Sequence, residues 1–219
     1  MKYKLVCFDL DGTLLDIPPP GYSWPMIHDY LNIPKSLTKP AMNDFYAGKI
    51  SYHEWCHYDI SLMIDAGATR DKILDVFKGT LPHKGAIETI RTLKSAGIKF
   101  AIISGSIQLL IEFLPNKDLF DDILINVLEF DKKGNLTGVI PTKYDQAGKA
   151  DGLRFIAERE GLNLSECVFV GDNDNDIEIA KTAGLSFAFN SKSEELDSVS
   201  SVVIKDIDLR SILPHILKD

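Results

Sequence analysis

Short apolar runs alternate along this chain with segments that have the periodicity of amphipathic helices. The strand-like runs cover residues 5–8, 100–103, 168–170, 186–189 and 202–204. Between them, a helical face with Ile90 and Leu93 stops at Gly97, and another around Leu153 stops at Gly161. Because parallel neighbours need a crossover connection, usually a helix, this alternation predicts an α/β fold with a Rossmann-like, doubly wound parallel sheet.

A hairpin is predicted where this alternation breaks down. Residues 123–130 and 136–140 are both strand-like, and the sequence Asp-Lys-Lys-Gly-Asn separates them. A connection this short and this rich in turn-forming residues joins antiparallel strands. We expect the two strands to form an antiparallel flank on the parallel sheet.

Residues 17–81 contain helical patterns and no strand-like run. Ser23 can cap one helix, and Ser51 opens the spacing of a capping box for another. We therefore expect a small helical cap domain of residues 17–81, inserted into an α/β core domain of residues 1–16 and 82–219.

The composition suits one ordinary globular core with a modest insertion, at 219 residues, 45% hydrophobic and 26% charged. No apolar run approaches the roughly 20 residues that a spanning helix requires, and the first residues do not resemble a secretion signal. The net charge of -8 opposes nucleic-acid or anionic-membrane partners, since both require Lys and Arg to neutralise phosphate. The three cysteines lack metal-ligand spacing and are expected to be buried, reduced thiols. We expect a cytoplasmic protein with a small-molecule partner, and the sequence sets no oligomeric state.

Two aspartates, Asp9 and Asp11, come directly after the first strand. Because they are two residues apart at a strand's carboxyl end, both can face the sheet edge at which open parallel sheets bind ligands. Gly12 then permits a tight turn. Short acidic pairs are common in loops, so an ordinary strand-to-loop junction explains this pair better when it is taken alone.

Two further polar elements lie beside predicted strands and helices. Ser104 and Gly105 precede a predicted helix over residues 107–114, whose N-terminus would offer an anion site. A simple serine N-cap explains the same pattern. Lys149 leads into another helix, a position in which most lysines are solvated surface groups.

The acidic loop after the strand at 168–170 is the most specific element. It reads Gly-Asp-Asn-Asp-Asn-Asp and places Asp172, Asp174 and Asp176 within five residues. Carboxylates crowded at a strand end repel one another, so this loop predicts a bound cation.

The order of these four elements resembles that of the haloacid dehalogenase superfamily. The resemblance spans nearly the whole chain, from Lys4 to about Ile216. It is closest to the phosphoserine phosphatase branch, through FDLDGT, the helical insert, ISGS, the hairpin, the lysine and GDNDND. It implies a phosphoric monoester hydrolase that acts on a small phosphorylated metabolite through an aspartyl phosphate.

The resemblance also implies the catalytic and metal-binding residues. Asp9 would be the nucleophile, and Asp11 would be the general acid and afterwards the general base. Mg²⁺ would be held by the side chains of Asp9 and Asp172 and by the backbone carbonyl of Asp11.

Phosphate-binding residues follow from the same resemblance. Ser104, the Gly105 N–H and Lys149 would bind the oxygens of the transferring phosphoryl group. Asn175 and Asp176 would not bind the substrate themselves, but would orient Lys149, the phosphate or metal-bound water through hydrogen bonds.

The sequence departs from this branch at the positions that read the substrate. The resemblance implies two substrate-binding residues. An acid after the first motif would bind the amino group of phosphoserine, and an arginine in the cap would bind its carboxylate. Here the first region reads DIPPPGYSW, and the cap helix HEWCHYD has no arginine, with Asp59 close to the expected place. The sequence therefore argues against phosphoserine as the substrate.

Three other functions remain open on the sequence. The same machinery could transfer the phosphoryl group to another molecule, as a phosphotransferase or phosphomutase. A phospho-acceptor signalling module also groups acids, a Ser or Thr and a Lys around Mg²⁺, although the helical insert and Asp11 oppose it. An inactive binding protein would not need the full set of site residues that this chain retains.

Overall fold

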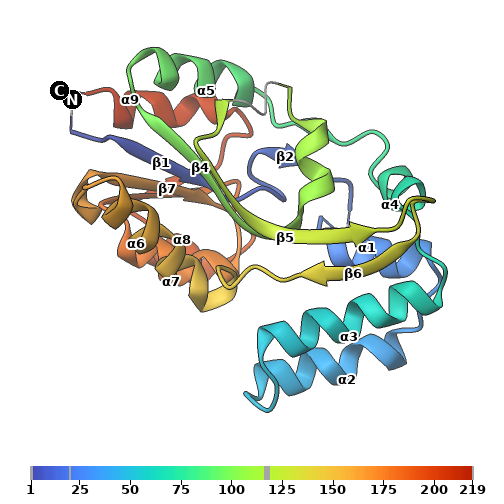
Figure 1. Ribbon diagram of the computed structural model, residues 1–219. Helices are drawn as coiled ribbons and strands as arrows, with labels where there is room; N and C mark the ends of the chain where they lie inside the picture. Colours follow the sequence, from blue (N-terminus) through green and yellow to red (C-terminus); the bar gives the residue numbers. More distant parts are fainter. Residues whose placement is uncertain (1, 20, 116–118, 219) are drawn as a thin grey trace.

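The computed structural model describes residues 2–19, 21–115 and 119–218. Its main sheet has the strand order β6-β5-β4-β1-β7-β8-β9, and all neighbours are parallel except β5 and β6 (Figure 1). The strands are β1 (Leu5–Phe8), β4 (Lys99–Ile107), β5 (Asp122–Phe130), β6 (Leu136–Ile140), β7 (Cys167–Gly171), β8 (Leu185–Phe189) and β9 (Val202–Ile204). This confirms the predicted α/β class and the antiparallel hairpin at one edge.

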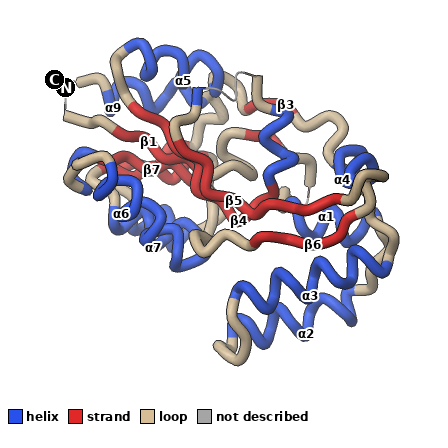
Figure 2. Tube along the Cα trace, in the orientation of Figure 1, coloured by secondary structure: helices blue, strands red, loops and turns tan. Residues whose placement is uncertain are grey.

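Helices cover both faces of this sheet (Figures 1 and 2). On one face lie α5 (Ala86–Ser95) and α9 (Leu213–Ile216), and on the other lie α6 (Lys149–Arg159), α7 (Ile177–Thr182) and α8 (Glu194–Val199). Alternate residues of β1 serve the two cores: Val6 and Phe8 pack with α5, whereas Leu5 and Cys7 pack with α6. Strands buried on both faces are typical of parallel sheets, and they explain the continuous apolar runs in the sequence.

The helices of residues 17–81 lie between two short strands that pair with each other. Leu15 of β2 (Leu15–Asp16) lies opposite Pro82 of β3 (Leu81–Pro82), so the insert begins and ends at one place. Its helices are α1 (Ser23–Tyr30), α2 (Lys35–Tyr46), α3 (Tyr52–Asp65) and α4 (Arg70–Val76). In Figure 1, α2 and α3 lie side by side at a distance from most of the sheet, and α3 packs on β6.

Of the two helix N-caps predicted in the insert, one is confirmed and one is wrong. Ser51 and Glu54 form the predicted capping box of α3. Ser23, however, is not a cap: Tyr22 occupies the N-cap position of α1 without a side-chain bond, and Ser23 lies inside the helix. Its backbone N–H donates to Asp11, and its hydroxyl is hydrogen-bonded to the hydroxyl of Ser106. That prediction was wrong because the serine is hydrogen-bonded to Asp11 and Ser106, which are distant in the sequence from the N-terminus of the helix that it was expected to cap.

The predicted helix over residues 107–114 was also wrong in part. Strand β4 continues to Ile107, and a 3-10 helix follows at Gln108–Phe113. Ile107 still pairs with Asn126 of β5, but the register shifts between Ile103 and Ile107. Residues 104–106 therefore form an irregularity within a strand, and no helix N-terminus follows directly on the serine.

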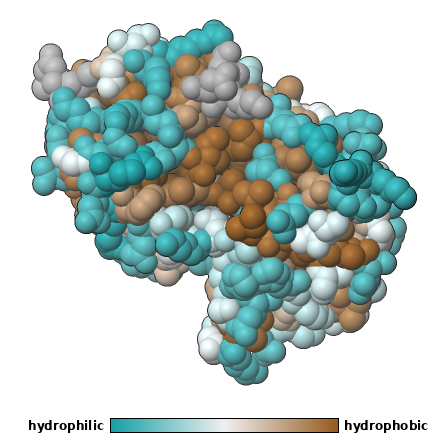
Figure 3. All heavy atoms as spheres, viewed as in Figure 1, coloured by the Kyte–Doolittle hydropathy of each residue, from teal (hydrophilic) through white to brown (hydrophobic). Residues whose placement is uncertain are grey.

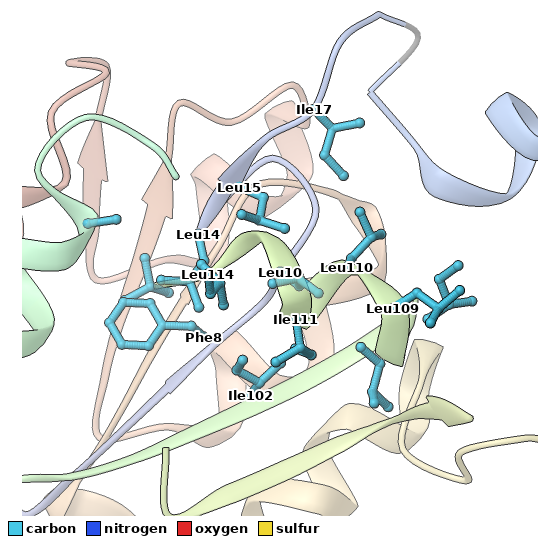
Figure 4. Packing of buried hydrophobic residues seen from close by; sticks show 14 of the residues in the cluster. Phe8, Leu10, Leu14, Leu15, Ile17, Ile102, Leu109, Leu110, Ile111 and Leu114 are labelled. Carbon is cyan, nitrogen blue, oxygen red and sulfur yellow. The ribbon is translucent and has the colours of Figure 1, made fainter. Parts of the chain in front are cut away.

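The loop after β1 is anchored in the main core. Figure 4 shows side chains from this loop packed against the 3-10 helix and against neighbouring strands; labelled are Phe8, Leu10, Leu14, Leu15, Ile17, Ile102, Leu109, Leu110, Ile111 and Leu114. Leu10 and Leu14 have no exposed surface. A loop held this firmly presents its acidic side chains in fixed positions.

The molecular surface is mixed. Figure 3 shows apolar side chains gathered on the face formed by β5 and β6, where Ile123, Val127 and Ile140 are exposed. Cys7, Cys56 and Cys167 are buried free thiols. Within the described part of the chain, every helix is too short or too polar to cross a membrane.

Candidate active site

The loop after β1 turns sharply and presents Asp9 to the sheet edge. The backbone N–H of Asp9 donates to the Val170 carbonyl at 2.9 Å, and Asp9 Oδ1 accepts from the Leu10 N–H at 2.8 Å. Gly12 has φ +78°, and a Cβ at this position would collide with the Asp172 carboxylate. The turn thus needs glycine both for its backbone conformation and for the approach of the acidic loop.

Lys149 joins the first motif to the acidic loop. Its Nζ lies 3.1 Å from Asp9 Oδ1 and 2.6 Å from Asp176 Oδ1, and all three side chains are buried. Burial alone lowers the pKa of Lys149, but the charges of Asp176 and Asp9 outweigh it and raise the pKa above its ordinary value. Lys149 is therefore a buried cation held by two carboxylates. It is not a solvated surface group, as most lysines at such a position are.

Three buried carboxylates, of Asp9, Asp172 and Asp176, each place an oxygen within 4.8 Å of the others. Asp176 is already used, because it accepts from Lys149 and from the backbone N–H groups of Asp172 and Asn173. Asp172 has a pKa well above its ordinary value, first through burial and then through the charge of Asp9. A hard divalent cation between Asp9 and Asp172 would remove that penalty, so the donor set fits Mg²⁺.

Thr13 is a site residue that sequence reasoning missed. Its hydroxyl donates to Asp172 Oδ1 at 3.1 Å and so orients that carboxylate. The signal was the threonine of FDLDGT, but its partner Asp172 follows a strand that is far away in the sequence. Only the pairing of β1 with β7 brings the two together.

The irregular segment at residues 104–106 lies beside these acids. The Ser106 N–H donates to Ser104 Oγ at 3.2 Å, and the Gly105 carbonyl accepts from the Trp24 indole at 2.9 Å and from the Asn126 amide at 2.7 Å. A Cβ on Gly105 would collide with Asp145. The segment is therefore held by α1 and β5, two partners that were not predicted.

Asp11 connects this site to the inserted helices. Its Oδ2 accepts from the backbone N–H of Ser23 at 3.0 Å, whereas Oδ1 is buried with no hydrogen-bond partner among the described residues. Burial first, and then the charge of Asp9, raises the pKa of Asp11 to about 6. A carboxyl group with this pKa can carry a proton near neutral pH and release it, as a general acid and base must.

Asn175 is hydrogen-bonded to a residue other than Lys149. Its amide donates to Asp145 Oδ1 at 3.4 Å, whereas Asp176 makes the direct contact with the lysine. Asp174 is exposed on the same loop. Of the two residues predicted to orient the site from behind, the structure places only Asp176 against Lys149.

A cavity of about 810 Å³ joins these residues to the insert. Its floor includes Asp9, Asp11, Ser104, Gly105 and Asp172. The other walls come from α1, α2 and α3 and from residues 145–146 and 173–175. This volume is within the roughly 300–1,000 Å³ of typical small-molecule sites. The arrangement can hold a small phosphorylated molecule with its phosphate on the sheet edge.

Replacing Lys149 with Met is expected to lower the free energy of unfolding by about 3–5 kcal/mol, because Asp9 and Asp176 would be left buried without their cation. Urea denaturation measures this change. Lys181→Met is the matched control, since Lys181 pairs with Glu178 at the surface and its loss should cost less than about 1 kcal/mol. Equal stabilities of the two variants would contradict the role of Lys149 as a buried counter-ion.

Comparison with known proteins identifies relatives over the full length. A family model for haloacid dehalogenase-like hydrolases matches residues 3–184. The phosphoserine phosphatase of Methanocaldococcus jannaschii is 33% identical over 219 residues, covering 98% of both chains.

Two solved structures are also similar. A phospho-aspartyl intermediate analogue of phosphoserine phosphatase has TM-score 0.77 and 31% identity, covering 99% of this chain and 100% of that one. A substrate-bound phosphoserine phosphatase complex has TM-score 0.78 and 30% identity, covering 99% of both.

Proposed function

The chain belongs to the haloacid dehalogenase-like hydrolases and is a phosphoric monoester hydrolase, and from this we propose that it is a Mg²⁺-dependent phosphatase acting on phosphoserine through an aspartyl phosphate. One observation carries the proposal. Asp9 is held 3.1 Å from a buried lysine, in the same cavity as Asp11, whose Oδ1 is unpaired among the described residues. Nucleophile, phosphate-binding cation and proton carrier are thus assembled in one place.

In the first step, an Asp9 carboxylate oxygen attacks phosphorus and the bond between phosphorus and the serine oxygen breaks. Asp11 gives its proton to that leaving oxygen. In the second step, a water oxygen attacks the phosphorus and the bond to Asp9 breaks. Asp11 takes a proton from the water, so both residues return to their starting states.

Charge stabilisation completes this mechanism. Lys149, Ser104 and the Gly105 N–H bind the phosphoryl oxygens, and Asp176 keeps Lys149 in place. The residues that would hold Mg²⁺ are Asp9, Asp172 and the backbone carbonyl of Asp11. When bound, Mg²⁺ offsets the repulsion between the Asp9 carboxylate and the phosphate.

Phosphoserine is proposed here against the expectation drawn from the sequence. The relatives that match almost the whole chain are phosphoserine phosphatases, and this similarity supports phosphoserine over that expectation. The physical reason lies in the insert, residues 17–81, which we propose acts as a cap. Lys35 and Lys39, which the sequence did not single out, line the cavity from α2, and Asp59 lines it from α3. Lys35 and Lys39 are one turn apart, so both can approach a carboxylate.

Phosphate release from O-phospho-L-serine tests the proposal. We expect release with Mg²⁺ and none after chelation, because Asp9 and Asp172 then repel the substrate. Asp172→Asn should raise the Mg²⁺ concentration for half-maximal activity at least about tenfold. Asp151→Asn, at an exposed aspartate outside the cavity lining, is the control and should leave it unchanged. Release that persists in chelator would contradict the metal assignment, and no release from phosphoserine would contradict the substrate.

A further inference from the structure

A second group of polar side chains lies in the cavity and takes no part in the mechanism above. It consists of His28 on α1 and Trp55 and Asp59 on α3. His28 is 8% exposed and Asp59 is 4% exposed. Three of their atoms, His28 Nε2, Trp55 Nε1 and Asp59 Oδ1, are buried and have no hydrogen-bond partner among the described residues. Buried polar atoms are rarely left unpaired unless a ligand completes them.

Asp59 in particular lacks a cation. In the described ranges its one possible ion-pair partner is His28, with Nε2 at 3.7 Å from Oδ2. Burial lowers the pKa of His28 to about 4, so this imidazole is neutral near pH 7. Burial also raises the pKa of Asp59 to about 7, and the nearby Trp55 indole offsets part of that rise. An incoming cation would restore the charged carboxylate.

Aromatic rings line the same cavity. Trp24, Tyr52 and Trp55 all contribute to its wall. Trp24 is fixed by its bond to the Gly105 carbonyl, and Trp55 stacks on Phe45 at 4.8 Å between ring centroids. Rings held in place beside a carboxylate favour an ammonium group, which they attract through their π-faces.

We propose that Asp59, with His28 and Trp55 beside it, is the receptor for the ammonium group of the substrate and determines specificity for phosphorylated amines. The inference rests on the proposed function, and it places the ammonium of phosphoserine at Asp59 while the phosphate lies on Asp9 and Lys149. His28, when neutral, can accept from that ammonium through its unpaired Nε2. The indole N–H of Trp55 only donates, so Trp55 contributes its ring, and Asp59 supplies the charge.

The test compares O-phospho-L-serine with 3-phosphoglycerate, which has a hydroxyl in place of the ammonium. The wild-type protein should prefer phosphoserine by about 30-fold or more in kcat/KM. Asp59→Asn should reduce that ratio by about the same factor, mainly through the KM for phosphoserine. Asp65→Asn, an exposed acid on the same helix, should keep the wild-type ratio.

A thermal midpoint separates this role from a structural one. Asp59→Asn should unfold at the same temperature as the wild type or higher, because an unpaired buried carboxylate has been removed. A wild-type enzyme that is active on both substrates without preference would overturn the inference, as would a variant that loses both activities equally. Wild-type protein that releases no phosphate from phosphoserine would instead overturn the proposed function.

Discussion

Replacing Asp9 with Asn is expected to reduce phosphate release from phosphoserine by about 10⁴-fold or more. The amide is a poor nucleophile. The other carboxylate beside Lys149, that of Asp176, is already occupied by Lys149 and by the backbone N–H groups of Asp172 and Asn173. Asn has the size of Asp and can still accept the hydrogen bond from the Leu10 N–H, so the loop should keep its turn. Phosphate release with excess enzyme measures the loss.

The control for Asp9→Asn is Asp16→Asn, an exposed aspartate at the end of β2 that should keep wild-type activity. Circular dichroism should show the same fold for both variants. If Asp9→Asn retained more than about a hundredth of the wild-type rate, direct attack by water would replace the covalent mechanism. The remaining site residues would then act as binding groups only.

Asp11→Asn is expected to produce the second largest effect, a loss of about 10²–10⁴-fold in turnover with phosphoserine. Asn can still accept the Ser23 N–H through its side-chain oxygen, so the link to α1 is preserved. It cannot give a proton to the leaving serine oxygen or take one from water. Both chemical steps should therefore slow.

An aryl phosphate separates the two steps in Asp11→Asn. Its leaving group departs without a proton, so the first step should survive and the phosphorylated protein should accumulate because the second step is slow. Mass spectrometry of the intact protein detects the added phosphoryl group. Rapid aryl phosphate turnover without accumulation would contradict the role of Asp11 as the base in the second step.

Much of the fold could be predicted because its signals are local. The strand at residues 202–204 was predicted with the bounds of β9, and the capping box of α3 depends on residues that are neighbours in the sequence. The failures had distant causes. Ser23 is drawn away from capping by Asp11 and Ser106, and β4 continues past Gly105 because Ile107 pairs with β5.

The candidate site shows the same division. The predicted strand ends placed Asp9 and Asp172 at one edge of the sheet, the family resemblance added Lys149, and the structure brings the three together. The contacts of Trp24 and Asn126 with Gly105 depend on how α1 and β5 pack, which no local pattern encodes. The insert is the extreme case, because the charged groups that it brings to the cavity come from two helices, α2 and α3, whose positions are set by tertiary packing.

The most direct test of the central claim is to map the covalent intermediate during turnover. The wild-type protein would be mixed with phosphoserine and Mg²⁺, quenched in acid and digested, and its peptides analysed by mass spectrometry. We predict one phosphorylated peptide, containing Asp9, that appears within the first turnover and disappears when substrate is exhausted. Phosphate release without any phosphorylated peptide, or with the phosphoryl group on another residue, would contradict this account.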